Sequence, residues 1–258
     1  MTDTTPGHIV ITGASGGLGA ALTRHYASRA ATLGLVARRT AELDRLAEQY
    51  PDRCTVHAAD VRDSAALRIA AAGFMAKHGA PDIVIANAGV SIGTLTEHAE
   101  DEQSFRDVFD INIIGMVNTF QPYIAAMRER GHGILVGIAS VAGYRGLPGA
   151  GAYSASKAAA ISYLEGLRVE LRGSGITVIT ICPGYIATAM TAHNPYRMPF
   201  IMTADDAAAK IAAIIAKRKT YAVIPWQMAI VARLMHVMPR MLYDPLAAKA
   251  GYKPRRKG

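Results

Sequence analysis

Short apolar runs alternate with longer amphipathic, Ala-rich segments over most of the chain. The runs are rich in Val, Ile and Leu and are apolar at nearly every position, which is typical of strands buried on both faces. Strands are predicted at His8–Thr12, Thr32–Ala37, Arg53–Ala58, Asp82–Ala86, Gly133–Ile138 and Gly175–Cys182. The alternation predicts an α/β protein with a doubly wound parallel sheet, in which ligands bind at the carboxyl ends of the strands.

The pattern changes after Gly184. A loop that contains Met, Pro and Thr runs to Met202, a capping box at Thr203–Asp206 starts a helix, and a short strand is expected at Tyr221–Ile224. An apolar and basic C-terminal extension, residues 225–258, follows. No repeat, low-complexity tract or flexible linker interrupts the chain, so we expect residues 1–258 to form a single domain.

Composition excludes several classes of protein. The chain has 258 residues, of which 51% are hydrophobic, and this is enough for an ordinary buried core. Cys54 and Cys182 lie far apart and outside any CxxC or Cys/His cluster, so we expect reduced thiols and no metal site. The N-terminus has no secretory signal pattern, and no apolar stretch is long enough to span a bilayer. These features favour a cytoplasmic protein.

The formal net charge of +8 is unevenly distributed. Residues 1–209 carry 17 basic and 19 acidic side chains, whereas residues 210–258 carry 11 basic residues and one acid, Asp244. The nearly neutral first part offers no basic surface to a phosphate backbone, which argues against nucleic-acid binding. The apolar segment Trp226–Tyr243, flanked by Arg and Lys, has the composition of a helix that lies on the inner face of a membrane. The competing interpretation is a helix that covers a pocket or packs against a second subunit.

A glycine-rich segment, Thr12–Gly19, connects the first strand to the helix that follows. A bound pyrophosphate requires a tight turn without side chains, free backbone N–H groups and the positive end of a helix dipole. Strand, glycine loop and helix occur here in that order, which predicts a nucleotide site.

The second strand ends at Ala37 and continues with Arg38 and Arg39. At this place an acid would bind a free ribose 2′-hydroxyl, whereas arginine would bind a 2′-phosphate. We therefore expect NADP(H) rather than NAD(H) as the cofactor. Two solvated arginines at a helix start are the alternative.

Ser140, Tyr153 and Lys157 form a candidate catalytic set. Ser140 follows the fifth strand at the expected ligand edge. Tyr153 and Lys157 stand four residues apart at the start of a helix predicted over Gly151–Arg172, which places them on one face. An ammonium near a phenol favours the phenolate, so we expect Lys157 to lower the pKa of Tyr153 and to make it a proton donor and acceptor near neutrality. The Ser140 hydroxyl is a candidate partner for a substrate carbonyl oxygen.

These motifs, in this order from Ile9 to Thr188, resemble the short-chain dehydrogenase/reductase family in its compact single-domain branch. The family's Thr-Gly-x-x-x-Gly-x-Gly motif is present, and Ala86–Gly89 is similar to its Asn-Asn-Ala-Gly with Ala in place of the first Asn. Pro183–Thr188 is similar to the Pro-Gly-x-x-x-Thr segment that contacts the nicotinamide. The resemblance implies a Rossmann-like fold with the strand order 3-2-1-4-5-6-7.

The resemblance also implies roles for individual residues. Asn112 would join Ser140, Tyr153 and Lys157 as the fourth catalytic residue, by kinking a helix and holding a water beside the lysine. The cofactor residues implied by the motifs are Gly13, Ser15, Gly16, Gly17, Leu18, Gly19, Arg38, Arg39, Asp60, Val61, Asn87, Ala88, Gly89, Tyr153, Lys157, Pro183, Gly184, Ile186 and Thr188. Gly16 stands where many NADP-preferring members have a basic residue, so the NADP expectation depends on Arg38 and Arg39 alone.

The reaction implied by the resemblance is hydride transfer between a nicotinamide and a ketone or secondary alcohol. Residues 185–202 would form a lid, and its Met, Tyr and Phe side chains favour a hydrophobic carbonyl substrate: lipid-like, sterol-like or aromatic. The expected substrate contacts are Ser140, Tyr153, Ile92, Tyr144 and Tyr185. A 3-ketoacyl thioester reductase and a non-catalytic cofactor-binding scaffold docked at membranes are the alternatives. A homodimer or homotetramer is expected by resemblance only.

Overall fold

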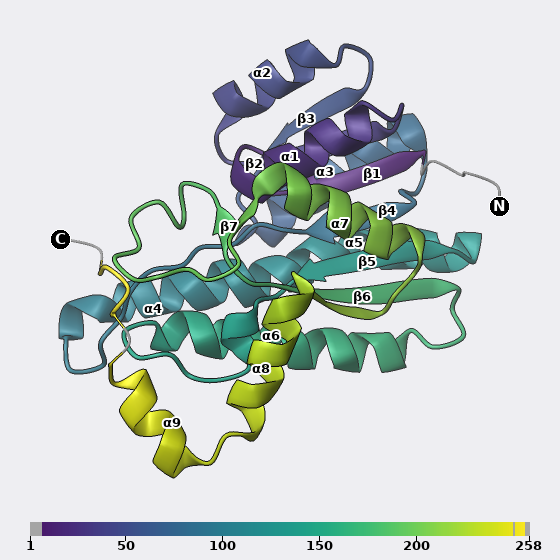
Figure 1. Cartoon of the computed structure of the whole chain (residues 1–258). Coiled ribbons are helices and arrows are strands. Elements are labelled where there is room, and N and C mark those ends of the chain that lie inside the picture. Colours follow the sequence, from purple (N-terminus) through teal and green to yellow (C-terminus); the bar gives the residue numbers. More distant parts are fainter. Residues whose placement is uncertain (1–6, 250, 256–258) are drawn as a thin grey trace.

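The computed structural model describes residues 7–249 and 251–255. In this part of the chain, seven parallel strands form the central sheet in the order β3-β2-β1-β4-β5-β6-β9 (Figure 1). The strands are β1 (His8–Thr12), β2 (Thr32–Ala37), β3 (Cys54–Ala58), β4 (Ile83–Ala86), β5 (Gly133–Ile138), β6 (Ile176–Pro183) and β9 (Tyr221–Ile224). Because β9 is the seventh strand of this sheet, the order is the predicted 3-2-1-4-5-6-7, and the fold class is confirmed.

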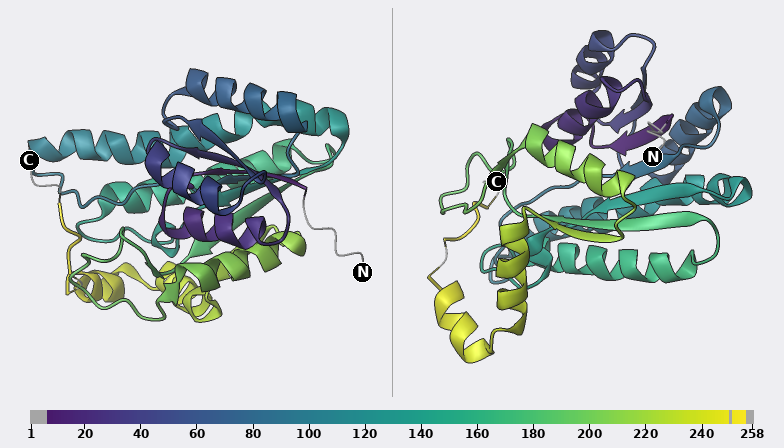
Figure 2. Two further views of the ribbon diagram at one scale, coloured as in Figure 1. Left: turned by 90° about the horizontal axis from the view of Figure 1, so that it is seen from above. Right: turned by 45° about the vertical axis from the view of Figure 1, so that its right-hand side comes forward.

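Helices cover both faces of the sheet (Figure 2). One face is packed by α1 (Gly17–Ala27), α2 (Thr40–Gln49) and α7 (Ala204–Ala216). The other is packed by α3 (Ser64–His78), α5 (Gly115–Arg130) and α6 (Gly151–Glu170), and α4 (Glu102–Phe109) packs against α6. The near-continuous apolar runs seen in the sequence are therefore explained, since successive side chains of each strand point into one or the other of two buried layers.

A glycine in β5 sets the distance between the sheet and α6, the helix that carries Tyr153 and Lys157. A Cβ at Gly137 would lie 2.4 Å from Cδ1 of Leu164, which is closer than two carbon atoms can approach. The absence of a side chain at Gly137 lets Leu164, fully buried on α6, pack directly on the strand backbone. The strand and the helix that hold the candidate catalytic residues are thus in direct contact.

The chain after β6 departs from the alternating pattern, as the sequence predicts. A two-stranded parallel pair, β7 (Ile186–Ala187) and β8 (Met202–Thr203), closes the segment 185–202 at its base. Helices α8 (Trp226–Val237) and α9 (Arg240–Ala247) then extend away from the sheet as a hairpin (Figure 1). None of the helices in residues 7–249 and 251–255 combines the length and the apolar content that crossing a membrane requires.

Candidate active site

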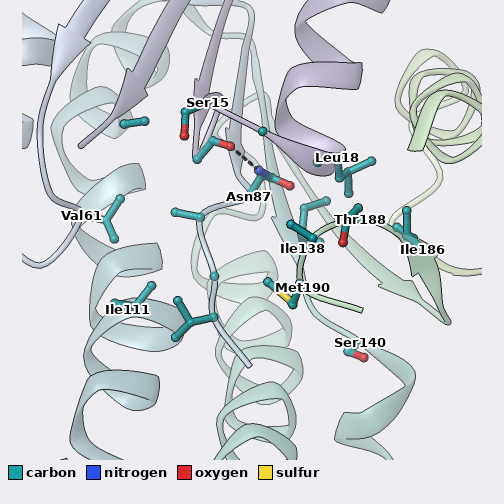
Figure 3. Close-up of a pocket in the computed structure, with 18 of the residues that line it drawn as sticks. Ser15, Leu18, Val61, Asn87, Ile111, Ile138, Ser140, Ile186, Thr188 and Met190 are labelled. Atoms are coloured by element: carbon teal, nitrogen blue, oxygen red, sulfur yellow. Dashed lines mark hydrogen bonds between the residues drawn. The ribbon is translucent and has the colours of Figure 1, made fainter. Parts of the chain in front are cut away.

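A cavity of about 530 Å³ opens at the carboxyl edge of the sheet. Figure 3 shows Val61 and Ile111 on one side of it and Ile186 and Thr188 on the other. The cavity is lined by all the cofactor residues expected from the sequence except Gly19, and by Ser140. Lining residues that the motifs did not single out are Ala37, Ala59, Val90, Ile111, Ile138, Ala139, Ala189, Met190 and Thr191. Several of these residues end a predicted strand or directly follow one. Their place at the strand ends is the sequence signal that could have identified them.

The glycine loop is shaped by close backbone approaches. Gly13 and Gly17 have φ values of 68° and 53°, in the left-handed region that favours glycine. A Cβ at Gly19 would lie 2.1 Å from the carbonyl oxygen of Gly13, so Gly19 packs behind the loop rather than lining the cavity. The amide of Asn87 fixes the loop from the next strand, because its Nδ2 donates to the carbonyl oxygens of Thr12 and Gly13 at 3.1 and 3.2 Å.

The N-terminus of α1 is suited to an anion. The helix begins without a side-chain cap and has no acid in its first turn. Its first N–H groups and the positive end of its dipole therefore lie beside the side-chain-free glycine loop. A side chain at Gly13 or Gly17 would meet Ala88 or Thr188 at 3.2 Å or less, so the loop has room for glycine only. It therefore presents backbone rather than side chains to a ligand, which fits a pyrophosphate group.

Two arginines follow β2 at the same cavity. The side chains of Arg38 and Arg39 are 59% and 67% exposed, so both guanidinium groups remain accessible. Nη2 of Arg39 lies 3.4 Å from Oγ of Ser15 in the glycine loop, and Nη1 of Arg38 lies 3.7 Å from Oδ2 of Asp60. Nη1 of Arg39 also lies 3.5 Å from Oε1 of Glu42, so each of the two cationic groups at the expected adenosine end has a carboxylate nearby, although no acid stands directly at the end of β2.

Arg62 is a residue that sequence reasoning missed. Its Nη2 and Nε donate to Oδ2 of Asp60 at 2.7 and 3.1 Å, and its Nη1 lies 3.4 Å from Asp107. The hydrogen bonds from Arg62 hold the pKa of the Asp60 carboxyl below its usual range. The site therefore keeps Asp60 as a fixed anion whose oxygens are already engaged, and no motif identified the arginine that engages them.

Lys157 lies buried between α6 and the end of β5. Its Nζ donates to the carbonyl oxygen of Ile138 at 2.8 Å, and only 5% of the residue is exposed. Burial lowers the pKa of Lys157 to about 8. A Cβ built on Gly89 would lie 3.6 Å from this Nζ and 3.2 Å from Oδ1 of Asn112, which shows how closely the β4 loop approaches both residues.

Asn112 sits in a π-helical turn, Asp110–Ile114, between α4 and α5. Its Oδ1 accepts from the N–H of Val90 at 2.9 Å, and its Nδ2 donates to the carbonyl oxygen of Val90 at 3.0 Å and to Ser156 at 2.9 Å. The side chain is fully buried and does not line the cavity. Asn112 therefore fixes the loop after β4 to the catalytic helix from behind the site.

Ser140 and Tyr153 face each other at the edge of the cavity. Oγ of Ser140 accepts from the N–H of Ala142 at 3.1 Å, lies 3.4 Å from the carbonyl oxygen of Pro183, and is hydrogen-bonded to the Tyr153 phenol. Burial raises the pKa of Tyr153, and the Ser140 hydrogen bond offsets this only in part. The lowered Tyr153 pKa expected from the sequence is therefore wrong for this structure, because desolvation of the phenol is the larger effect.

The residues expected to contact substrate are only partly brought together. Ile92, Tyr144 and Tyr185 do not line the cavity within the described part of the chain. The Tyr144 hydroxyl is 2.7 Å from that of Tyr221, so the hydrogen bond turns it toward β9. Tyr185 lies against Tyr196 in the lid, with ring centroids 6.4 Å apart. Cys54 and Cys182 are free thiols, and no group of three metal-binding side chains is found in the part of the chain that the structure describes.

A glycine loop at a helix N-terminus, a carboxyl-edge cavity and a half-buried tyrosine on the same helix as a buried lysine define a dinucleotide-binding oxidoreductase. Residues 7–198 match the family model described as short chain dehydrogenase, and the chain belongs to that family. It is thus an oxidoreductase of the type that acts on CH–OH and C=O groups.

Relatives of similar length support this assignment. An uncharacterized oxidoreductase of Myxococcus xanthus is 36% identical over 245 residues, which cover 93% of this chain and 96% of the relative. The ketoacyl reductase HetN of Nostoc is 31% identical and covers 92% of this chain and 85% of its own length. A short chain dehydrogenase from Burkholderia cenocepacia, solved in complex with NADP, has the same fold with a TM-score of 0.82 at 24% identity, and the match covers 94% of this chain and 98% of that one.

The buried charge of Lys157 predicts a measurable cost in stability. The pKa is about 8 in the folded chain against an ordinary 10.5, so the unfolded chain holds the proton more tightly. The penalty is fully present below pH 8 and is relieved as the pH rises from 8 to 10.5. Lys157→Met should raise the free energy of unfolding by roughly 2–4 kcal/mol at pH 7, with a smaller gain at each higher pH.

Urea denaturation of both proteins between pH 7 and pH 10.5 measures this difference. A gain that stays constant with pH would contradict a lysine that is charged and desolvated in the folded state. Lys217→Met, in which the exposed C-cap residue of α7 is replaced, serves as the matched control and should change little.

Proposed function

We propose that this chain is an NADP(H)-dependent oxidoreductase that interconverts a ketone and a secondary alcohol. The observation that carries the proposal is the meeting of Ser140, Tyr153 and Lys157 at one end of a cavity whose other end is the glycine loop. A nicotinamide dinucleotide held by that loop supplies or accepts the hydride. The chain supplies binding, orientation and a proton.

The protein's part of the reaction follows from the contacts. In the reductive direction, the Tyr153 phenol donates its proton to the carbonyl oxygen while Ser140 holds that oxygen by a hydrogen bond. Because the pKa of Tyr153 is raised, the phenol is in its proton-donating form at neutral pH. Lys157 places a positive charge behind it at a fixed position. Asn112 keeps the β4 loop and α6 together, so the geometry is set before substrate binds.

A hydrophobic carbonyl is the substrate class that the lid favours. Met190 lines the cavity, and Tyr185 and Tyr196 pack against each other within the same lid. Side chains of this kind recognise lipid-like, sterol-like or aromatic ketones. A 3-ketoacyl thioester is the second candidate, because the Nostoc relative is described as a ketoacyl reductase.

NADP(H) is the cofactor that the arginines favour. The fork of donors on Arg38 and Arg39 is exposed at the adenosine end, next to Ser15, and fits a ribose 2′-phosphate. The carboxylate of Asp60 is held by Arg62, so it adds no free acid to repel that phosphate.

The C-terminal extension has the surface of a membrane-docking element. Exposed on α8, at helical spacing, are Trp226, Ile230, Leu234 and Val237; exposed on α9 are Met241, Leu242 and Leu246. The opposite face of α8 packs on the body of the protein through Met228 and Ala232. Arg145 fixes the hairpin, since it donates to the carbonyl oxygens of Met235 and Met238 and lies over the Tyr243 ring. We name the exposed residues of α8 and α9 the hairpin face.

An anionic lipid surface is the partner that suits the hairpin face. Arg233 and Arg240 are exposed beside the apolar side chains, and the segment 210–258 has a single acid. Pairing two copies through this face would bring like charges together, whereas anionic head groups are complementary to it. The homo-oligomer expected from the family would then use other surfaces.

Replacing the proton donor tests the reaction. Tyr153→Phe removes the phenolic proton and should lower kcat for ketone reduction by about 10²–10⁴, with the cofactor still bound. NADPH oxidation over a panel of hydrophobic ketones and a 3-ketoacyl thioester measures this and identifies the substrate class. Equal rates in the two proteins would refute the mechanism, and turnover of none of the carbonyls would favour a cofactor-binding scaffold.

Replacing the arginine tests the cofactor. Arg38→Ala removes a partner of the 2′-phosphate and should weaken NADPH binding by about tenfold or more while changing NADH binding little. Fluorescence titration with both cofactors measures the two affinities. Arg45→Ala, an exposed arginine on α2, controls for net charge. An equal effect of Arg38→Ala on NADPH and NADH would contradict the assignment.

Replacing an apolar side chain of the hairpin face by an acidic one tests membrane docking. Leu234→Glu should abolish co-sedimentation with vesicles that contain anionic phospholipid, because it places an anion in the apolar part of the hairpin face. Wild type should sediment with anionic vesicles and not with neutral ones. Ile69→Glu on α3, also exposed but outside the face, is the matched control. Absence of wild-type sedimentation, or equal sedimentation of both variants, would refute the docking.

A further inference from the structure

The last described residues, 251–255, lie beside the lid, in which Met190 lines the cavity. They lie between the lid and the segment that precedes α4 (Figure 1). The N–H of Gly93 donates to the carbonyl oxygen of Pro254 at 3.0 Å, and Gly149 packs against the Tyr252 ring so closely that a Cβ there would lie 2.6 Å from it. We name residues 251–255 the C-terminal strap.

One end of the strap is attached by charge. Nε of Arg255 donates to Oδ2 of Asp101 at 2.7 Å, and its Nη2 donates to Oε1 of Glu100 at 2.9 Å. The same Asp101 oxygen accepts from the N–H of Leu95 at 2.8 Å. Asp101 is 5% exposed, so this junction joins the strap to the 93–101 segment through a largely buried carboxylate.

The other contact is with the lid. Nζ of Lys253 donates to Oδ1 of Asn194 at 3.0 Å and lies 3.5 Å from the carbonyl oxygen of Met190. Lys253 is 9% exposed, and it takes part in none of the ion pairs found among the described residues. A nearly buried ammonium that is held by lid oxygens fixes the position of the lid relative to the strap.

The strap also packs against the lid at Tyr196. A Cβ at Gly251 would lie 3.2 Å from Cβ of Tyr196, so the strap has no side chain where Tyr196 packs. Burial raises the pKa of Tyr196 to about 12, and its ring lies against that of Tyr185 with the centroids 6.4 Å apart. The strap therefore holds a lid whose residues Ala189, Met190 and Thr191 line the cavity.

We propose that the C-terminal strap determines which carbonyls reach Tyr153: by tying the lid to the 93–101 segment, it sets the width of the substrate entrance and excludes bulky ketones. This rests on the proposed ketone reduction. Two side chains attach the strap: Lys253 binds the lid, and Arg255 binds Asp101 and Glu100. The residues that would determine substrate specificity are therefore far in sequence from the catalytic residues.

Hydrogen exchange in the full-length protein tests the tie without any turnover. Amides of lid residues 188–198 should exchange at least about fivefold faster in Lys253→Met and Arg255→Ala, because opening of the lid no longer breaks the strap contacts. Arg255→Lys should exchange more slowly than Arg255→Ala, since it keeps the charge. Lys249→Met and Arg240→Ala, exposed residues near and on α9, are the matched controls. Lid exchange that is unchanged in both strap variants would refute the tie.

The ketone panel tests the specificity. The ratio of kcat/KM for the bulkiest accepted ketone to that for the smallest should rise about tenfold in the strap variants, with kcat for the small ketone little changed. Faster lid exchange with an unchanged ratio would refute a role in specificity. If wild type reduces no ketone, the proposed reaction fails, and the exchange rates still decide whether the strap holds the lid.

Discussion

A parallel sheet that is buried on both faces leaves one place for polar chemistry, the edge where its strands end. In this protein β1, β4, β5 and β6 run in the same direction, and the loops that follow them carry the glycine turn, Asn87, Ser140 and the 183–188 segment. The apolar pattern that fixes the sheet therefore also fixes which residues can meet. The catalytic helix approaches that edge because Gly137 has no side chain to keep it away.

The site also contains a buried charge that lowers the stability of the fold. Lys157 brings a positive charge into the protein with a backbone carbonyl as its direct partner, and Asn112 holds the adjoining loop and helix in place from behind. Charges buried in this way reduce stability and are found where an active site needs them. The π-helical turn at Asp110–Ile114 is a second local departure from regular structure, and it lies at the same site.

The parallel sheet, the glycine turn and the Ser140, Tyr153 and Lys157 set followed from local pattern, whereas the strand order and the roles of Asn112 and Asn87 came from the family resemblance. Contacts between side chains that lie far apart in the sequence could not be predicted in this way. Arg62 at Asp60, the raised pKa of Tyr153 and the Tyr144–Tyr221 hydrogen bond depend on burial and on which elements become neighbours. The pairing of Arg255 with Asp101 spans 154 positions, and the basic composition of the tail gave no sign of a partner so far away. The described basic residues of the C-terminal extension thus fall into two groups: those that attach the strap to the lid and to the 93–101 segment, and those that are exposed on the hairpin.

In the proposed reaction Ser140 and Tyr153 hold a carbonyl oxygen while a hydride passes to the carbonyl carbon. NADPH deuterated at C4 of the nicotinamide in each of its two configurations tests this transfer, with the best hydrophobic ketone as substrate and mass spectrometry of the alcohol as the measurement. A single fixed site should transfer deuterium from one configuration only, to the carbinol carbon. Deuterium in neither product, or transfer from both configurations alike, would contradict the account.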